Sequence, residues 1–164
     1  MKPETPFKRQ PREALPKHMQ TAHDRSMELH GDATFIEVLG SAPHMFDWYM
    51  EDFYKKVFYG SKIPKRVIEL VRLRLANIHG CAMCNRADKI GAKAAGVSDA
   101  EIEALPNYET GPFSDAEKAA LALADVMVLT NPKGMVSPEL YARAKLHFTD
   151  GEMVELGMIM AVLC

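Results

Sequence analysis

The sequence has little cysteine and almost no net charge. Of its 164 residues three are cysteine, and the formal net charge is −2. A chain so close to neutral gives no electrostatic reason to expect nucleic acid or an anionic membrane as a partner. Three cysteines do not make a disulfide framework. Because two of them lie three positions apart, a catalytic or metal-binding pair in a reducing compartment is the more common reading.

Long hydrophobic runs are also missing. No apolar stretch approaches the ~20 residues that a membrane-spanning helix needs. The first residues, MKPETPFKRQPREALPK, include basic side chains but neither an apolar core nor a small-residue cleavage site, so they do not resemble a secretory signal. We therefore expect a cytoplasmic protein that binds neither membranes nor nucleic acid.

Strand patterns are absent too, and the apolar residues recur with a helical period, which predicts an all-α fold. The expected helices cover residues 17–30, 34–39, 43–59, 64–79, 81–95, 118–129, 138–148 and 150–164. Capping boxes of the form Ser-x-x-Glu at Ser98 and Ser114 mark further helix starts. The aromatic residues within 45–58 suggest a core or a subunit interface.

Prolines divide the chain into an arm and a domain. Four of the ten prolines lie in residues 1–16, which we interpret as an extended N-terminal arm, either disordered or wrapped over a neighbour. Residues 17–164 contain no linker and no repeat. Their length suits one domain, so we predict a single-domain helical bundle.

The clearest chemical pattern is Gly80-Cys81-Ala82-Met83-Cys84 at the start of a predicted helix. Two cysteines at this spacing can close a disulfide across one turn, and the free N–H groups and positive dipole end of the helix stabilise a thiolate. Inert packing and a zinc site are the alternatives. A structural zinc site usually has four nitrogen or sulfur ligands. Besides the two cysteines, the nearby candidates are His79 and Asp88, and Cys164 is distant in sequence. We favour redox chemistry and expect no metal or cofactor.

The stretch IPKRVIELVRLRLANIHGCAMCNRADKIGAKAAGVSDAEIEAL, residues 63–105, resembles the core of the carboxymuconolactone decarboxylase superfamily, in its alkylhydroperoxidase D-like branch. That branch carries a Glu, eleven residues, Cys-x-x-Cys, three residues and a His. The later segments FSDAEKAALALADVMVLT and LHFTDGEMVELGMIMA also resemble the family's helices. The resemblance covers most of the chain from about residue 35.

The resemblance implies an all-α homo-oligomer, commonly a trimer or hexamer, that reduces organic hydroperoxides. Cys84 would attack the peroxide, Cys81 would resolve the sulfenic acid into a disulfide, and Glu69 matches the relay carboxylate. An external dithiol would then reduce the disulfide. The decarboxylases of the superfamily generally lack the cysteine pair, which argues against that activity.

Two positions depart from the family pattern: Asp88 stands where the His is expected, and Met83 where the best-known members carry a His between the cysteines. An ionised Asp88 beside a thiol would raise the thiol pKa, which predicts a weak peroxidase. The competing possibility is that burial raises the pKa of Asp88 enough to make it a useful relay. We count Cys84, Cys81, Glu69 and Asp88 as the candidate catalytic residues.

Several readings stay open. Glu69, considered without the resemblance, is a solvated helix charge, as Arg72 and Arg86 are by default. Twelve residues of straight helix span ~18 Å, so Glu69 needs a chain reversal or a neighbouring subunit to approach the cysteines. The alternative functions are a decarboxylase-like lyase or isomerase that uses Glu69 as its base and needs neither cysteine, and a non-catalytic oligomeric or metal-binding protein.

Overall fold

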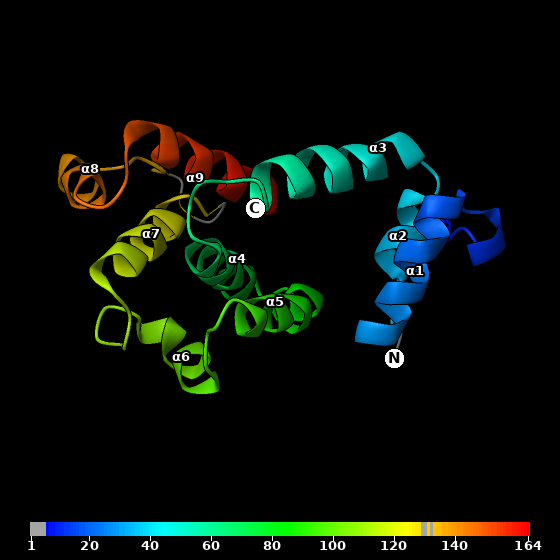
Figure 1. The fold of residues 1–164 in the computed structure, drawn as a ribbon, viewed down its shortest axis with the longest axis horizontal. Helices are drawn as coiled ribbons and strands as arrows, with labels where there is room; N and C mark the ends of the chain where they lie inside the picture. The colour runs from blue at the N-terminus through cyan, green and yellow to red at the C-terminus, as the bar shows by residue number, and fades with distance from the viewer. Residues whose placement is uncertain (1–5, 129–130, 132) are drawn as a thin grey trace. The chain divides into compact units, whose positions relative to one another are not determined.

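The computed structural model describes residues 6–128, 131 and 133–164. These residues form helices and no strand, which confirms the all-helical class (Figure 1). They fall into two compact units, one ending at Gly60 and the other beginning at Ser61, and each is described by itself. The assignment of residues 17–164 to one domain stays a prediction.

From residue 6 onward, the first unit contains three α-helices, one short 3₁₀ turn and one π-helix. They are η1 (Arg12–Ala14), α1 (Lys17–His30), α2 (Thr34–Leu39), α3 (Pro43–Asp47) and the π-helix η2 (Trp48–Phe58). The bounds of α1 and α2 are those predicted from the sequence. Its core brings together Leu15, Met19, Ile36 and Phe46. Leu15 belongs to the predicted arm, so the arm contributes to this core.

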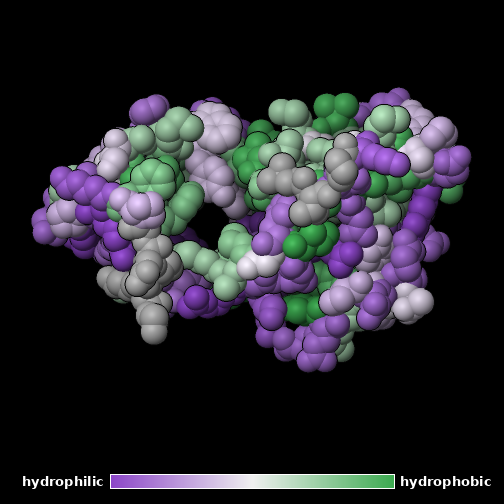
Figure 2. All heavy atoms as spheres, turned by 180° about the vertical axis from the view of Figure 1, so that it is seen from behind, coloured by the Kyte–Doolittle hydropathy of each residue, from purple (hydrophilic) through white to green (hydrophobic). Residues whose placement is uncertain are grey.

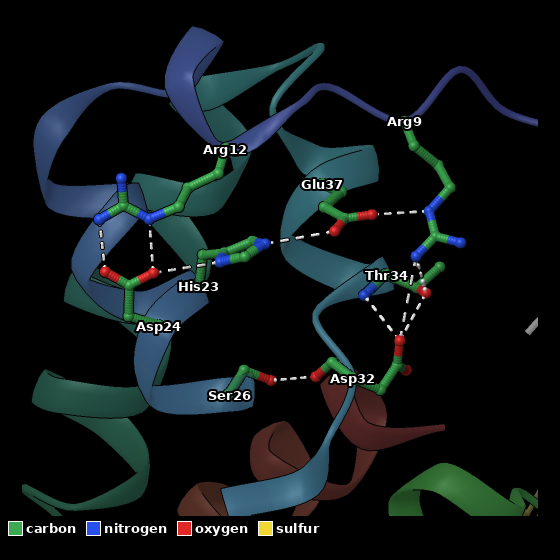
Figure 3. Close-up of polar contacts among 8 residues, drawn as sticks. All are labelled: Arg9, Arg12, His23, Asp24, Ser26, Asp32, Thr34 and Glu37. Atoms are coloured by element: carbon green, nitrogen blue, oxygen red, sulfur yellow. Dashed lines mark hydrogen bonds and ion pairs between the residues drawn. The ribbon is translucent and has the colours of Figure 1, made fainter. Parts of the chain in front are cut away.

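Ion pairs hold the described part of the arm against α1 and α2, as Figure 3 shows. Arg9 Nε donates to Glu37 Oε2 at 2.6 Å, and Arg9 Nη2 donates to Thr34 Oγ1 at 2.5 Å. Arg12 forms a two-pronged pair with Asp24 on α1. These contacts lie within the first unit. Residues 1–5 of the predicted arm lie outside the described residues.

The aromatic segment departs from the predicted α-helix, because residues 48–58 form a π-helix that continues α3. A π-helix bonds each N–H to the carbonyl five residues earlier, and the N–H of Tyr59 reaches the carbonyl of Tyr54 at 2.8 Å. Aromatic pairs recur in the sequence every five residues, which suits this wider turn. The ring contacts at that spacing join Trp48 to Phe53, Tyr49 to Tyr54, Phe53 to Phe58 and Tyr54 to Tyr59.

The second unit is arranged around α4, which packs against α5, α7 and α9 (Figure 1). Its elements are α4 (Lys65–His79), α5 (Ala82–Ala94), α6 (Asp99–Ala104), η3 (Leu105–Asn107), α7 (Asp115–Val126), α8 (Pro138–Lys145) and α9 (Asp150–Leu163). Leu70 and Leu73 on α4 have no exposed surface and meet Ala92 of α5 and Leu121 of α7 in the core. The helix that precedes the cysteines is therefore central to the core of the unit.

Ser or Thr side chains cap the starts of four of the described helices in this unit, among them α8, which Ser137 caps. Capping boxes are present at Ser98 and Ser114, as predicted, and a third is formed by Thr149 at the start of α9. In each, the Ser or Thr oxygen accepts a backbone N–H that the helix leaves unpaired, and a Glu three residues later reaches back.

Two helices end about one turn before the predicted end. The helix expected over 118–129 is α7, which ends at Val126; the last predicted residue, Leu129, lies outside the described residues. The helix expected to reach Phe148 ends at Lys145. Beyond Lys145 the N–H groups of His147 and Phe148 both bond to the carbonyl of Ala144, three and four residues back.

Apolar side chains remain at the surface of α9. Leu156, Ile159 and Met160 are buried, whereas Val154 is 66% exposed and Met158 is 59% exposed. Figure 2 shows hydrophobic residues among hydrophilic ones on one face of the molecule. Within the described ranges, no helix is both long enough and apolar enough to cross a membrane.

The turn between α4 and α5 requires a glycine at position 80, and this requirement can be tested by its effect on stability. Gly80 has φ 66°, a left-handed conformation that costs an L-residue roughly 1–2 kcal/mol. Gly80→Ala should therefore lower the free energy of unfolding by about 1 kcal/mol, although a Cβ there would meet no atom within 4 Å. Urea unfolding measures the change.

Gly157→Ala is the matched control for this substitution. Gly157 lies inside α9 and also has open space around its Cβ position. Alanine should raise stability there by up to about 1 kcal/mol, because it favours a helix interior. If both variants shift stability in the same direction, the backbone conformation of Gly80 is not what decides the effect.

Candidate functional site

The two cysteines close a disulfide at the N-terminus of α5. Cys81 and Cys84 are bonded, with their Cα atoms 5.3 Å apart, a separation ordinary for a disulfide. Cys81 caps the helix: it has extended backbone angles, and its sulfur accepts the N–H of Cys84 at 3.2 Å. Both sulfurs thus lie at the positive end of the helix dipole, which stabilises a thiolate once the bond is reduced.

The two cysteines differ in exposure. Cys84 is exposed and Cys81 is half-buried. The start of α5 is tied to the end of α4 by Asn85, whose Nδ2 donates to the carbonyls of Ala76 at 2.9 Å and Cys81 at 3.0 Å. A small substrate can therefore approach Cys84 while the turn that carries Cys81 is held in place.

Behind the cysteines lies a buried cluster of three charged side chains: Glu69 and Arg72 on α4, and Asp88 on α5. Their exposures are 3%, 9% and 7%. Arg72 Nη2 lies 2.7 Å from Glu69 Oε2, and Arg72 Nε lies 3.2 Å from Asp88 Oδ1. The default reading of Glu69 and Arg72 as solvated helix charges was wrong, because the packing of α5 on α4 covers both.

The reversal at Gly80 brings Glu69 to α5 within a single chain. Asn85 lies opposite Ala76, Asp88 opposite Arg72, and a Cβ on Gly91 would lie 2.7 Å from Glu69 Oε2. Glu69 therefore lies opposite Gly91 of α5. Gly91 is about two helical turns from Cys84, a rise of ~10 Å along the helix. Asp88, one turn from Cys84, lies between them. The structure places Glu69 beside Asp88 and not beside the sulfurs.

Burial changes the proton affinity of both carboxyl groups. It raises the pKa of Asp88 to about 6, although the charge of Arg72 acts to lower it. Burial also raises the pKa of Glu69; Arg72 opposes this change and the charge of Asp88 adds to it. A carboxyl group with a pKa near 6 exchanges its proton close to neutral pH, which is the condition that a relay at Asp88 requires.

Arg72 is the residue that sequence reasoning missed. Its spacing of three from Glu69 was a usable signal, because residues three apart are neighbours on a helix. Spacing alone could not show that α5 covers this pair, nor that Asp88 completes it.

The other chemical candidates lie elsewhere. Cys164 forms no disulfide, and its sulfur donates to the carbonyl of Met127 at 3.2 Å. Among the residues that the structure describes, no group of three or more His, Cys, Asp and Glu side chains is placed to hold a metal. An apolar pocket of about 270 Å³ is lined by residues of α7, α8 and α9 and by Met127 and Val136, away from the α4–α5 turn.

Three comparisons place the chain among known proteins. It is 32% identical over 100 residues to the uncharacterized protein YdfG of Bacillus subtilis, covering 60% of this chain and 67% of YdfG. It is 35% identical over 89 residues to the uncharacterized protein Rv2313c of Mycobacterium tuberculosis, covering 54% of this chain but only 31% of that longer protein.

A solved structure shares the fold. The crystal structure of ATU0492 from Agrobacterium tumefaciens, described as a protein of unknown function and a candidate antioxidant defence protein AhpD, matches with a TM-score of 0.68. The match covers 76% of this chain and 84% of that one at 22% identity. The model of the carboxymuconolactone decarboxylase family matches residues 45–126, half of the chain. The chain belongs to the carboxymuconolactone decarboxylase family.

Proposed function

We propose that this protein is a thiol–disulfide oxidoreductase that reduces organic hydroperoxides through Cys81 and Cys84. The observation that carries the proposal is the Cys81–Cys84 disulfide at the start of α5, with exposed Cys84 one helical turn from the buried carboxyl group of Asp88. The sulfur that meets substrate, its resolving partner and a proton acceptor are thus gathered on one helix.

In the proposed cycle, the Cys84 thiolate attacks one oxygen of the hydroperoxide, the O–O bond breaks, and the leaving alkoxide takes a proton to become an alcohol. Cys84 is then a sulfenic acid. The Cys81 sulfur attacks it, forming the disulfide and releasing water. An external dithiol returns two electrons and two protons by thiol–disulfide exchange, and is itself oxidised to a disulfide. A reducing compartment such as the cytoplasm would keep that dithiol available.

Asp88 accepts the Cys84 proton in this scheme and passes it to the alkoxide, with Glu69 as the second carboxyl group of the relay. Its burial supports this role, because an acid–base group works best with a pKa near the operating pH. The name of ATU0492 supports an antioxidant activity at the level of a shared fold. The lyase alternative is less well supported, since Glu69 is 3% exposed and paired with Arg72, away from incoming substrate.

A free-thiol count tests the proposal. Fully reduced protein should lose Cys81 and Cys84 as free thiols when a small excess of an organic hydroperoxide is added, while Cys164 remains free. One alcohol should appear for each disulfide formed, and peptide mapping should locate the bond. A dominant bridge to Cys164, or a pair that stays reduced, would contradict the proposal.

We also propose that the protein is a homo-oligomer, such as the trimer or hexamer that the family resemblance implies. The exposed side chains of Val154 and Met158 on α9 support self-association, because exposed apolar surface often marks an interface. Light scattering at micromolar concentration should give a mass well above the 18.3 kDa of one chain. A monomer under these conditions would contradict this prediction.

A further inference from the structure

The guanidinium group of Arg72 lies between α4 and α5, where Gly91 has no side chain. A Cβ on Gly91 would lie 2.3 Å from Arg72 Nη2 and 2.7 Å from Glu69 Oε2. Contacts that short do not occur, so any side chain at this position would displace the ion pair. Only a glycine here lets the backbone of α5 approach the guanidinium and the carboxylate so closely.

Through this placement Arg72 bridges two carboxyl groups on different helices. Nη2 meets Glu69 on its own helix, and Nε meets Asp88 on α5. Two nitrogens of one rigid, planar group thereby form an ion pair with each carboxyl group. Lysine, with a single charged atom on a flexible stem, cannot reproduce this geometry. Arg72 is therefore the side chain that links both carboxyl groups.

We propose that Arg72 is a positioning residue that joins Glu69 and Asp88 into one proton-sharing unit behind Cys84. This unit would take the place of the histidine that the family pattern expects at Asp88. The inference about how the unit is used in turnover depends on the proposed function. The existence of the unit and its effect on the Cys84 thiol do not depend on the proposed function.

The charges of the cluster support the sharing of one proton between Glu69 and Asp88. One guanidinium balances one carboxylate, so two ionised carboxylates would leave a net negative charge where water is excluded, which is costly. With one proton on either carboxyl group the cluster is neutral. Lys65, Arg72 and Asp88 are the charged groups that act on Glu69, and Arg72 acts on Asp88. Such coupled groups titrate as a pair.

The pKa of Asp88 tests the proposal directly, and carboxyl-carbon NMR of selectively labelled aspartate in the disulfide form can measure it. Asp88→Asn identifies the signal. In Arg72→Gln the pKa should rise by about one unit or more, because an opposite charge has been removed from the carboxylate. Arg72→Lys should restore only part of the difference. Arg74→Gln is the control: Arg74 lies on the same helix and pairs with Asp125 at 2.8 Å, so Asp88 should titrate as before.

A second readout separates positioning from a purely structural role. In the reduced protein, the alkylation rate of Cys84 should follow pH with a step at the Asp88 pKa, and this step should move with it in Arg72→Gln. Gly91→Ala, which keeps every charge but displaces the guanidinium, should shift the step in the same direction. Circular dichroism verifies that each variant is folded. If Arg72→Gln is unfolded, the pH profiles of Gly91→Ala and Arg72→Lys test the proposed role of Arg72 instead.

Three results would overturn the proposal. They are an unchanged Asp88 pKa in the folded Arg72 variants, an equal shift in Arg74→Gln, and a shifted pKa that leaves Cys84 alkylation unaffected. None of these measurements requires hydroperoxide. A protein that shows the expected shifts but consumes no hydroperoxide would refute the proposed function and leave the role of Arg72 standing.

Discussion

Cys84→Ser is expected to abolish the reaction with hydroperoxide, whereas Cys81→Ser should react once and then stop as a sulfenic acid or a mixed disulfide. Cys84 is the exposed sulfur, one turn from Asp88, and Cys81 is the half-buried cap of α5. A serine hydroxyl cannot replace a thiolate as nucleophile at neutral pH. Mass spectrometry after one equivalent of hydroperoxide distinguishes the two variants.

Cys164→Ser is the control for this pair, since Cys164 forms no disulfide and lies outside the site. It should turn over like the wild type. The reverse pattern, with Cys81→Ser silent and Cys84→Ser trapped after one turnover, would exchange the roles of the two cysteines and remove the argument for Asp88 as the acceptor.

Asp88→Asn should lower peroxidase turnover at neutral pH by about 10²-fold, the scale of a lost general base. Asp88 accepts a proton only when ionised, so the wild-type rate should rise as pH passes through about 6, the pKa to which burial raises it. The variant should lose this step and keep only the rise that follows the thiol. Rates from pH 5 to 9 at saturating reductant give both profiles.

Asp88→His decides between the two accounts of this position. Glu69 and Arg72 are arranged around a carboxyl group, so the histidine variant should also lose most activity. A histidine variant that works faster than the wild type near neutrality would show that Asp88 is a handicap, as its charge alone suggests, and that the relay account is wrong.

Stability provides a check that is independent of turnover. Because the folded-state pKa of Asp88 lies above its ordinary value of 3.8, the folded protein binds this proton more tightly than the unfolded chain. The free energy of unfolding should therefore fall as pH rises between about 4 and 6. Asp88→Asn should flatten this part of the profile, and urea unfolding at several pH values measures it.

Local patterns predicted most of the helices and the dithiol. Gly31 and Gly80, Pro43, and the capping boxes at Ser98 and Ser114 are signals that act within a few residues, and the structure uses each of them. The Cys-x-x-Cys spacing likewise closes within one turn. Such features can be predicted without knowing which parts of the protein pack against them.

The remainder depended on packing between helices. The burial of Arg72 and the raised pKa of Asp88 follow from α5 lying on α4, which no short pattern specifies. An aspartate has an ordinary pKa until something excludes water from it. In residues 48–58 the aromatic pairs recur every five residues, a spacing that suits a π-helix, whereas the ordinary helical period of 3.6 predicts an α-helix there.

The central claim is that Cys81 and Cys84 form a catalytic dithiol, and sustained hydroperoxide consumption tests it most directly. With excess organic hydroperoxide and a small-molecule dithiol as reductant, the rate should be proportional to the concentration of the wild-type protein. The double variant Cys81→Ser, Cys84→Ser should match the uncatalysed rate. Equal consumption by the wild type and the double variant would contradict the account.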